Sequence, residues 1–141
     1  VRGDEFDADI ICKGESAVYH KLHELYDLGN GASVKDKGLI TVLELSFELY
    51  KRGFSILKVD LYKSEATTFT IEGNALRPPL SALSGVGVNA AKAIAEARKE
   101  GEFISKEDLR LRAKVTKSVI EAMSNHGCLE GMSETNQLSL F

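Results

Sequence analysis

The chain has little of what would place it in a membrane, a disulfide scaffold or a metal site. No apolar run in its 141 residues reaches the length that crosses a bilayer, and we expect no signal peptide. The two cysteines, Cys12 and Cys128, lie far apart without a metal-ligand spacing. We therefore expect reduced thiols in a cytoplasmic protein. The chain opens on Val1 instead of methionine, which indicates a piece of something larger.

The charged residues are unevenly distributed. Residues 1–76 hold 9 basic and 13 acidic residues (−4), residues 77–128 hold 9 and 6 (+3), and residues 129–141 hold 0 and 2 (−2). A local basic excess is the electrostatic footprint expected of a nucleic-acid contact. A solvated helix surface could carry the same modest excess.

The most informative stretch runs from Leu80 to Ile94. Its apolar residues follow helical spacing on either side of Ser84-Gly85-Val86-Gly87, which predicts a helix-hairpin-helix. Glycine can take positive φ and allows another backbone to approach closely. The alternative is an ordinary glycine-containing turn between packed helices.

The second helix of this hairpin begins at Gly87-Val88-Asn89. Free N–H groups and the positive end of the helix dipole make such a start an anion site. Lys92, about one turn further on, could add a charged contact. The sequence therefore predicts a site for a nucleic-acid phosphate.

In the first half, residues 1–13 are expected to form an extended, acidic entry segment rather than a metal site. A helix is predicted from Ser16 to about Leu28, and its His20 and His23 are interpreted as surface residues. Ser33-x-x-Asp36 has the form of a capping box. It opens a helix to about residue 51 with so many apolar residues that we expect a buried spine.

The middle of the chain predicts extended structure. Residues 54–62 form one short run, and residues 69–71 and 75–77 are predicted to pair as a hairpin across Glu72-Gly73-Asn74. Pro78-Pro79 ends the last strand.

Two more helix starts, at Ser105 and Thr116, predict a second, degenerate hairpin with Lys114-Val115 at its turn. Arg112, Lys114 and Lys117 could contact a duplex backbone or lie on a solvated surface. The expected fold class is mainly α with a small β-hairpin: a tandem helix-hairpin-helix module preceded by a helical segment.

After Leu129 the sequence becomes a small, polar linker that ends in Gln137-Leu138-Ser139-Leu140-Phe141. Three large apolar side chains at a terminus suggest a pocket on another protein. The alternative is a terminus that folds back onto its own core.

The hairpin stretch resembles the helix-hairpin-helix pattern of DNA repair and replication proteins, with Ser84 where proline is commoner. The resemblance implies that the amides of Gly85 and Gly87 hold a duplex backbone without reading bases. It also implies a possible K⁺ or Na⁺ site on hairpin carbonyls, those of Ser81, Leu83 and Val86.

Four segments together resemble the C-terminus of PolC-type DNA polymerase III alpha subunits: residues 56–64, 83–87, 101–109 and 136–141. The resemblance implies a fingers-proximal segment (1–75), a duplex-binding domain (76–130) and a clamp-binding tail (131–141). The last five residues are similar to the bacterial sliding-clamp motif. In it Leu140 and Phe141 fill a pocket, Leu138 makes a shallower contact and Gln137 hydrogen-bonds at the rim.

The resemblance further implies that the intact protein is a Mg²⁺-dependent DNA-directed DNA polymerase with a 3′–5′ proofreading exonuclease. This chain alone is expected to be non-catalytic and without a cofactor. The implied partners are primer-template duplex, the clamp (the beta subunit) and other replisome subunits, with no membrane. Two alternatives remain: a stand-alone DNA-binding module of a repair or competence protein, and a protein-interaction domain.

Overall fold

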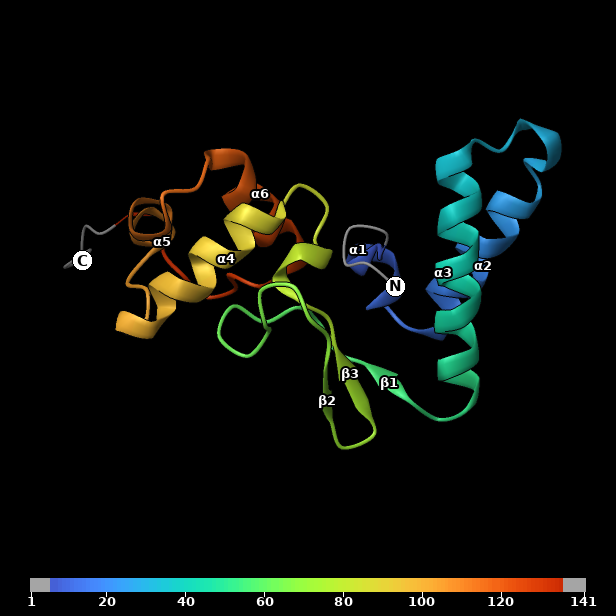
Figure 1. Cartoon of the computed structure of the whole chain (residues 1–141), viewed down its shortest axis with the longest axis horizontal. Helices are drawn as coiled ribbons and strands as arrows, with labels where there is room; N and C mark the ends of the chain where they lie inside the picture. Colours follow the sequence, from blue (N-terminus) through green and yellow to red (C-terminus); the bar gives the residue numbers. More distant parts are fainter. Residues whose placement is uncertain (1–5, 136–141) are drawn as a thin grey trace.

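The computed structural model describes residues 6–135, and it is mostly helical with one small sheet (Figure 1). The pair α2–α3 lies at one end of the molecule, α4, α5 and α6 lie at the other, and the sheet lies between them. In chain order the elements are α1 (Ala8–Ile11), α2 (Glu15–Tyr26), η2 (Gly29–Gly31), α3 (Val34–Lys51), β1 (Ser55–Ile56), β2 (Thr70–Glu72), β3 (Ala75–Arg77), η3 (Leu80–Ala82), α4 (Val88–Ala97), η4 (Arg98–Glu100), α5 (Lys106–Ala113) and α6 (Lys117–His126). The expected fold class, mainly α with a small β-hairpin, is confirmed.

The start of α3 is the predicted capping box. The Ser33 hydroxyl accepts the Asp36 N–H at 3.0 Å, and the Asp36 carboxylate accepts the Ser33 N–H at 2.9 Å. The backbone hydrogen bond from Ser33 lowers the pKa of the Asp36 carboxyl, because it stabilises the ionised form. A local sequence signature thus set the first residue of the longest helix.

The expectation that α3 is a buried spine was wrong. The helix packs on α2, but it buries only Val42, Leu43 and Ser46. Val34 is 89% exposed and Leu45 is 49% exposed. Within residues 6–135 no layer covers the outer face of α3, so apolar content alone overstated its burial.

The expectation of an extended entry segment was also wrong. The segment contains the short helix α1, capped by the Asp7 side chain, which accepts the Ile10 N–H at 3.3 Å. The predicted second helix is confirmed as α2, which begins at Glu15, one residue before Ser16. Gly14 has a φ of +111°, which glycine adopts without a Cβ clash, and the chain turns there before Ser16.

The sheet has the order β1-β3-β2. Strands β2 and β3 form the predicted antiparallel hairpin, with Ile71 opposite Leu76. Glu72, expected in the loop, instead belongs to β2 and pairs with Ala75. Strand β1 pairs parallel with β3, Ser55 opposite Ala75, which the sequence did not predict. Only residues 55–56 of the expected extended run form a strand, and residues 57–64 form the connecting segment.

The core is continuous through the molecule. Side chains from every part contribute, and those of Ile11, Leu43, Leu80, Ile94, Leu109 and Met123 are fully buried. Cys12 and Cys128 are free thiols, and burial raises the pKa of each to about 12. None of the helices in the described part of the chain is long and apolar enough to span a membrane.

Candidate nucleic-acid interface

The first hairpin is fixed to the body of the protein at its entry. Pro78 and Pro79 are fully buried and lead the chain from β3 into η3. The N–H of Leu80 donates to the Glu65 carbonyl at 2.9 Å, and that of Ser81 donates to the Ala66 carbonyl at 3.1 Å. The element before the turn is therefore one 3₁₀ turn anchored by backbone bonds, where the sequence predicted a short helix.

The turn uses its two glycines differently. Gly85 has a φ of +93°, and a Cβ there would lie 3.4 Å from the Ala122 Cβ of α6. Gly87 has an ordinary φ of −71° and is the N-cap of α4, with no atom within 4 Å of where a Cβ would lie. The backbone thus requires glycine at Gly85, whereas Gly87 leaves open space at the start of α4.

The N-terminus of α4 is open to a ligand. No side chain caps it, whereas Ser33, Ser105 and Thr116 cap α3, α5 and α6. Helix α2 also lacks a side-chain cap, but it carries an acidic residue in its first turn, and α4 does not. The first backbone N–H groups of α4 have no intrahelical acceptor, so they can bind an anion.

Most of the predicted phosphate site is accessible. Ser84, Gly85, Gly87, Val88, Asn89 and Lys92 are all exposed. Val86 is only 3% exposed, and its N–H donates to the Leu83 carbonyl at 3.0 Å. Val86 therefore closes the turn from inside and does not face a ligand.

The Lys92 ammonium is unpaired within residues 6–135. Lys99, in the 3₁₀ turn η4 that follows α4, is by contrast paired, because its Nζ lies 3.0 Å from the Glu96 carboxylate. Lys92 thus presents a full positive charge one turn from the open N–H groups.

The second hairpin repeats the backbone of the first without its open site. Lys114 has left-handed backbone angles (φ 55°, ψ 42°), as Gly85 has positive φ, and Thr116 is the N-cap of α6, as Gly87 is of α4. The Thr116 hydroxyl accepts the Val119 N–H at 3.4 Å, a donor that has no side-chain partner in the first hairpin. The prediction of a degenerate second hairpin agrees with this geometry, and Lys114 and Lys117 are exposed beside it.

Arg112, also predicted to contact DNA, is occupied within the protein. Its guanidinium donates to the carbonyls of Glu102 (3.0 Å), Ala97 (2.8 Å) and Gly101 (3.1 Å). It also lies 3.4 Å from the Asp108 carboxylate and 4.4 Å from the centroid of the Phe103 ring. Arg112 ties α5 to the end of α4, so we remove it from the candidate contacts.

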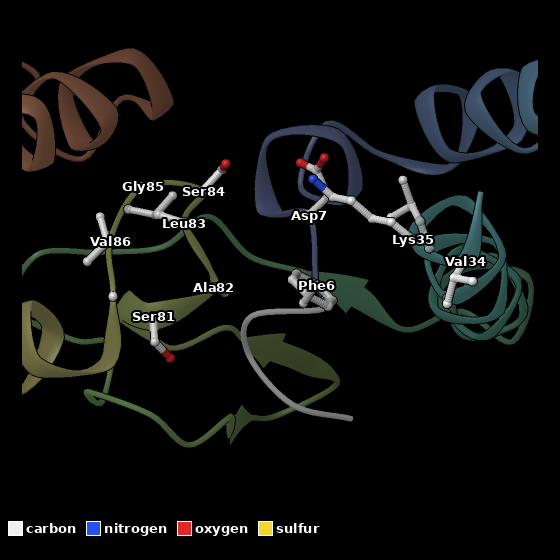
Figure 2. A pocket seen from close by; sticks show the side chains of 13 residues that line it. Phe6, Asp7, Val34, Lys35, Ser81, Ala82, Leu83, Ser84, Gly85 and Val86 are labelled. Atoms are coloured by element: carbon white, nitrogen blue, oxygen red, sulfur yellow. The ribbon is translucent and has the colours of Figure 1, made fainter. Parts of the chain in front are cut away.

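A cavity of about 770 Å³ opens beside the turn (Figure 2). Residues 81–87 form one wall, and Phe6, Asp7 and the first turns of α3 form the other. The turn is therefore not covered by neighbouring side chains on that side. The predicted cation site uses carbonyls of this wall, and that of Leu83 already accepts one N–H, with a second lone pair remaining.

Two further predictions concern the clamp motif of the tail and the acidic residues of the entry segment. The clamp motif Gln137-Leu138-Ser139-Leu140-Phe141 lies outside residues 6–135. Within those residues no group of three His, Cys, Asp or Glu side chains could hold a metal ion, and this includes Asp7 and Asp9.

Comparison with known proteins gives two results. Residues 53–138 match a helix-hairpin-helix motif family. All 141 residues align with proteins called DNA polymerase III PolC-type, at 69% identity in Clostridium perfringens, 55% in Oceanobacillus iheyensis and 51% in Bacillus subtilis. The chain spans about 10% of the length of each of these relatives.

Proposed function

Because this chain belongs to the helix-hairpin-helix family, we propose that it binds the sugar-phosphate backbone of duplex DNA as part of a PolC-type DNA polymerase. The family match and the similarity to PolC-type polymerases support a DNA-binding role in a replicative polymerase. The observation that carries the proposal is the uncapped, exposed start of α4 at Gly87-Val88-Asn89. Backbone amides fit phosphate oxygens of any sequence, so the contact positions the duplex without selecting bases.

The charges nearby suit the same ligand. Lys92 adds a cation next to the first turn of α4, and Lys114 and Lys117 add two beside the second hairpin. We propose that the first hairpin supplies amide contacts and the second mainly lysine contacts, since Thr116 already uses one of its N–H groups. A K⁺ or Na⁺ ion on the carbonyls of Ser81, Leu83 and Val86 would bring further positive charge to the turn.

The test is a titration of fluorescent linear duplex with the 141-residue chain at several salt concentrations. Binding through phosphates falls steeply with salt, by about 0.9 log units of affinity per log unit of salt for each neutralised phosphate. Lys92→Ala should lower this slope by about one phosphate. Lys99→Ala removes the same charge from an ion pair with Glu96, and it should leave the slope unchanged. Salt-independent binding, or equal effects of the two variants, would overturn the proposal.

We further propose that the last five residues tether the polymerase to a sliding clamp. A clamp that encircles DNA makes rebinding intramolecular, which raises the effective concentration of duplex. Leu140→Ala with Phe141→Ala should abolish binding to purified clamp and leave duplex affinity unchanged. Asn136→Ala, just outside the motif, serves as the control. If the double variant binds clamp normally, the tether is not in this motif.

For the intact protein we propose DNA-directed polymerisation with 3′–5′ proofreading in the cytoplasm, together with other replisome subunits. We propose, from the resemblance to PolC-type polymerases, that the carboxylates that bind Mg²⁺ lie in the part of the protein upstream of this chain. Residues 1–75, 76–130 and 131–141 would then be the fingers-proximal, duplex-binding and clamp-binding parts. Primer extension by this chain alone, with dNTPs and Mg²⁺, would contradict the division.

A further inference from the structure

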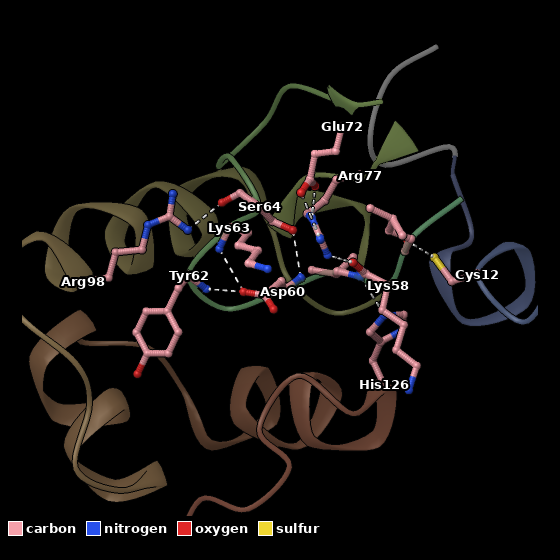
Figure 3. Close-up of polar contacts among 12 residues, drawn as sticks. Cys12, Lys58, Asp60, Tyr62, Lys63, Ser64, Glu72, Arg77, Arg98 and His126 are labelled. Atoms are coloured by element: carbon pink, nitrogen blue, oxygen red, sulfur yellow. Dashed lines mark hydrogen bonds and ion pairs between the residues drawn. The ribbon is translucent and has the colours of Figure 1, made fainter. Parts of the chain in front are cut away.

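A buried histidine joins the helix-hairpin-helix module to the N-terminal part of the chain. Figure 3 shows its ring beside the segment that contains Lys58. His126 is the last residue of α6, and its side chain is 3% exposed. Its Nδ1 lies 3.0 Å from the Asp9 carboxylate of α1, and its Nε2 accepts the Val59 N–H at 3.1 Å. The ring thus bonds to two segments that lie 117 and 67 residues away in sequence.

These partners determine the protonation of the ring. The Val59 N–H is a donor, so Nε2 must be unprotonated to accept it. The proton of the neutral ring is then on Nδ1, where it donates to the Asp9 carboxylate. Both ring nitrogens are used, and only the neutral Nδ1–H form satisfies both bonds.

Two thiols add hydrogen bonds among the same three segments, α1, residues 57–59 and the end of α6, which we call the joint. The Cys12 thiol, just after α1, donates to the Leu57 carbonyl at 3.1 Å, and the Cys128 thiol, just after α6, donates to the Val59 carbonyl at 3.2 Å. Residues 57–59 are therefore bonded both to α1 and to the end of α6. They lead from β1 to the segment that supports the first hairpin.

We infer that His126 is a positioning residue that fixes the helix-hairpin-helix module against α1 and residues 57–59. This inference rests on the proposed function: the joint sets the angle at which duplex bound at the first turn meets the rest of the polymerase.

The other charged groups at the joint come from α1 and the connecting segment. Asp9 belongs to α1 and Asp7 is its N-cap, and Lys58 and Asp60 belong to the connecting segment. The Lys58 ammonium lies near Gly127, at 3.8 Å from where a Cβ would be.

The first experiment follows the Val59 amide and the His126 ring by NMR in the 141-residue chain. Nitrogen shifts should identify the Nδ1–H tautomer of the neutral ring. His126→Asn keeps a donor near Asp9 and loses the acceptor for Val59, so exchange of the Val59 amide should rise about tenfold. His23→Asn, on an exposed histidine, should change neither.

The second experiment measures the orientation of α3 relative to α4 by residual dipolar couplings, without DNA. His126→Asn should change this orientation, while the couplings within each half stay the same. The single variant Asp9→Asn, whose amide oxygen can still accept from Nδ1, should keep most of the wild-type orientation. An Nε2–H ring, unchanged Val59 exchange in His126→Asn or an unchanged orientation of the helices would overturn the inference. Failure of duplex binding would instead overturn the proposed function, because neither experiment contains DNA.

Discussion

Replacing Asn89 by aspartate should stabilise the protein and weaken its binding to DNA. Asn89 is the second residue of α4, exposed and next to the open N–H groups. The substitution Asn89→Asp keeps the shape of the side chain and adds one negative charge. A negative charge in the first turn interacts favourably with the helix dipole, but it repels a phosphate bound there.

The two effects have calculable sizes. The dipole interaction is worth about 0.3–1 kcal/mol, which corresponds to a rise in Tm of about 1–4 °C for a chain of this length. A phosphate about 5 Å away is repelled by about 1–3 kcal/mol for an effective dielectric between that of water and that of a protein surface. Duplex affinity should therefore fall by about 5-fold to 100-fold.

The assay pairs a thermal melt with the duplex titration. Ser16→Asp is the matched control, because it adds the same charge at the second position of α2, at the other end of the molecule. Ser118→Asp makes the same change on α6 and reports whether the second hairpin also contacts phosphate. If Asn89→Asp raises Tm but binds duplex as Ser16→Asp does, no phosphate binds at the start of α4.

Three further predictions concern stability. Gly85→Ala should cost about 1–2 kcal/mol in chemical denaturation because of its positive φ and its contact with α6, and Gly87→Ala should cost less. Arg112→Ala should lower the free energy of unfolding by about 2 kcal/mol because three carbonyls lose a donor, whereas the exposed Arg110→Ala should stay within about 0.5 kcal/mol. The lowered pKa of Asp36 contributes stability above the unfolded-state pKa and loses it as pH falls through the folded value. The free energy of unfolding of Asp36→Asn should therefore fall less steeply with decreasing pH than that of the wild type. Identical pH profiles of the two proteins would refute this role.

The sequence predicted features that depend on residues a few positions apart. The capping box at Ser33, the helix starts at Ser105 and Thr116 and the β2–β3 hairpin were all confirmed. The candidate phosphate site also followed from local order, since a helix that starts on glycine has free N–H groups whatever surrounds it. These features need no knowledge of the rest of the fold.

Other predictions failed where the partner is distant in sequence. Arg112 reads as a surface cation, yet its carbonyl partners lie 10 to 15 residues earlier. The parallel pairing of β1 with β3 depends on the path of residues 57–74, and the burial of α3 depends on what packs on its outer face. No spacing rule contains that information.

The sequence by itself determined the local chemistry of this protein: a turn with two glycines, an uncapped helix start and lysines in one basic segment. Only the tertiary structure decided which of these groups face solvent, because Val86 and Arg112 turn inward while Lys92 does not. It also decided that His126 meets Asp9, since a hydrogen bond across 117 residues depends on the packing of whole helices.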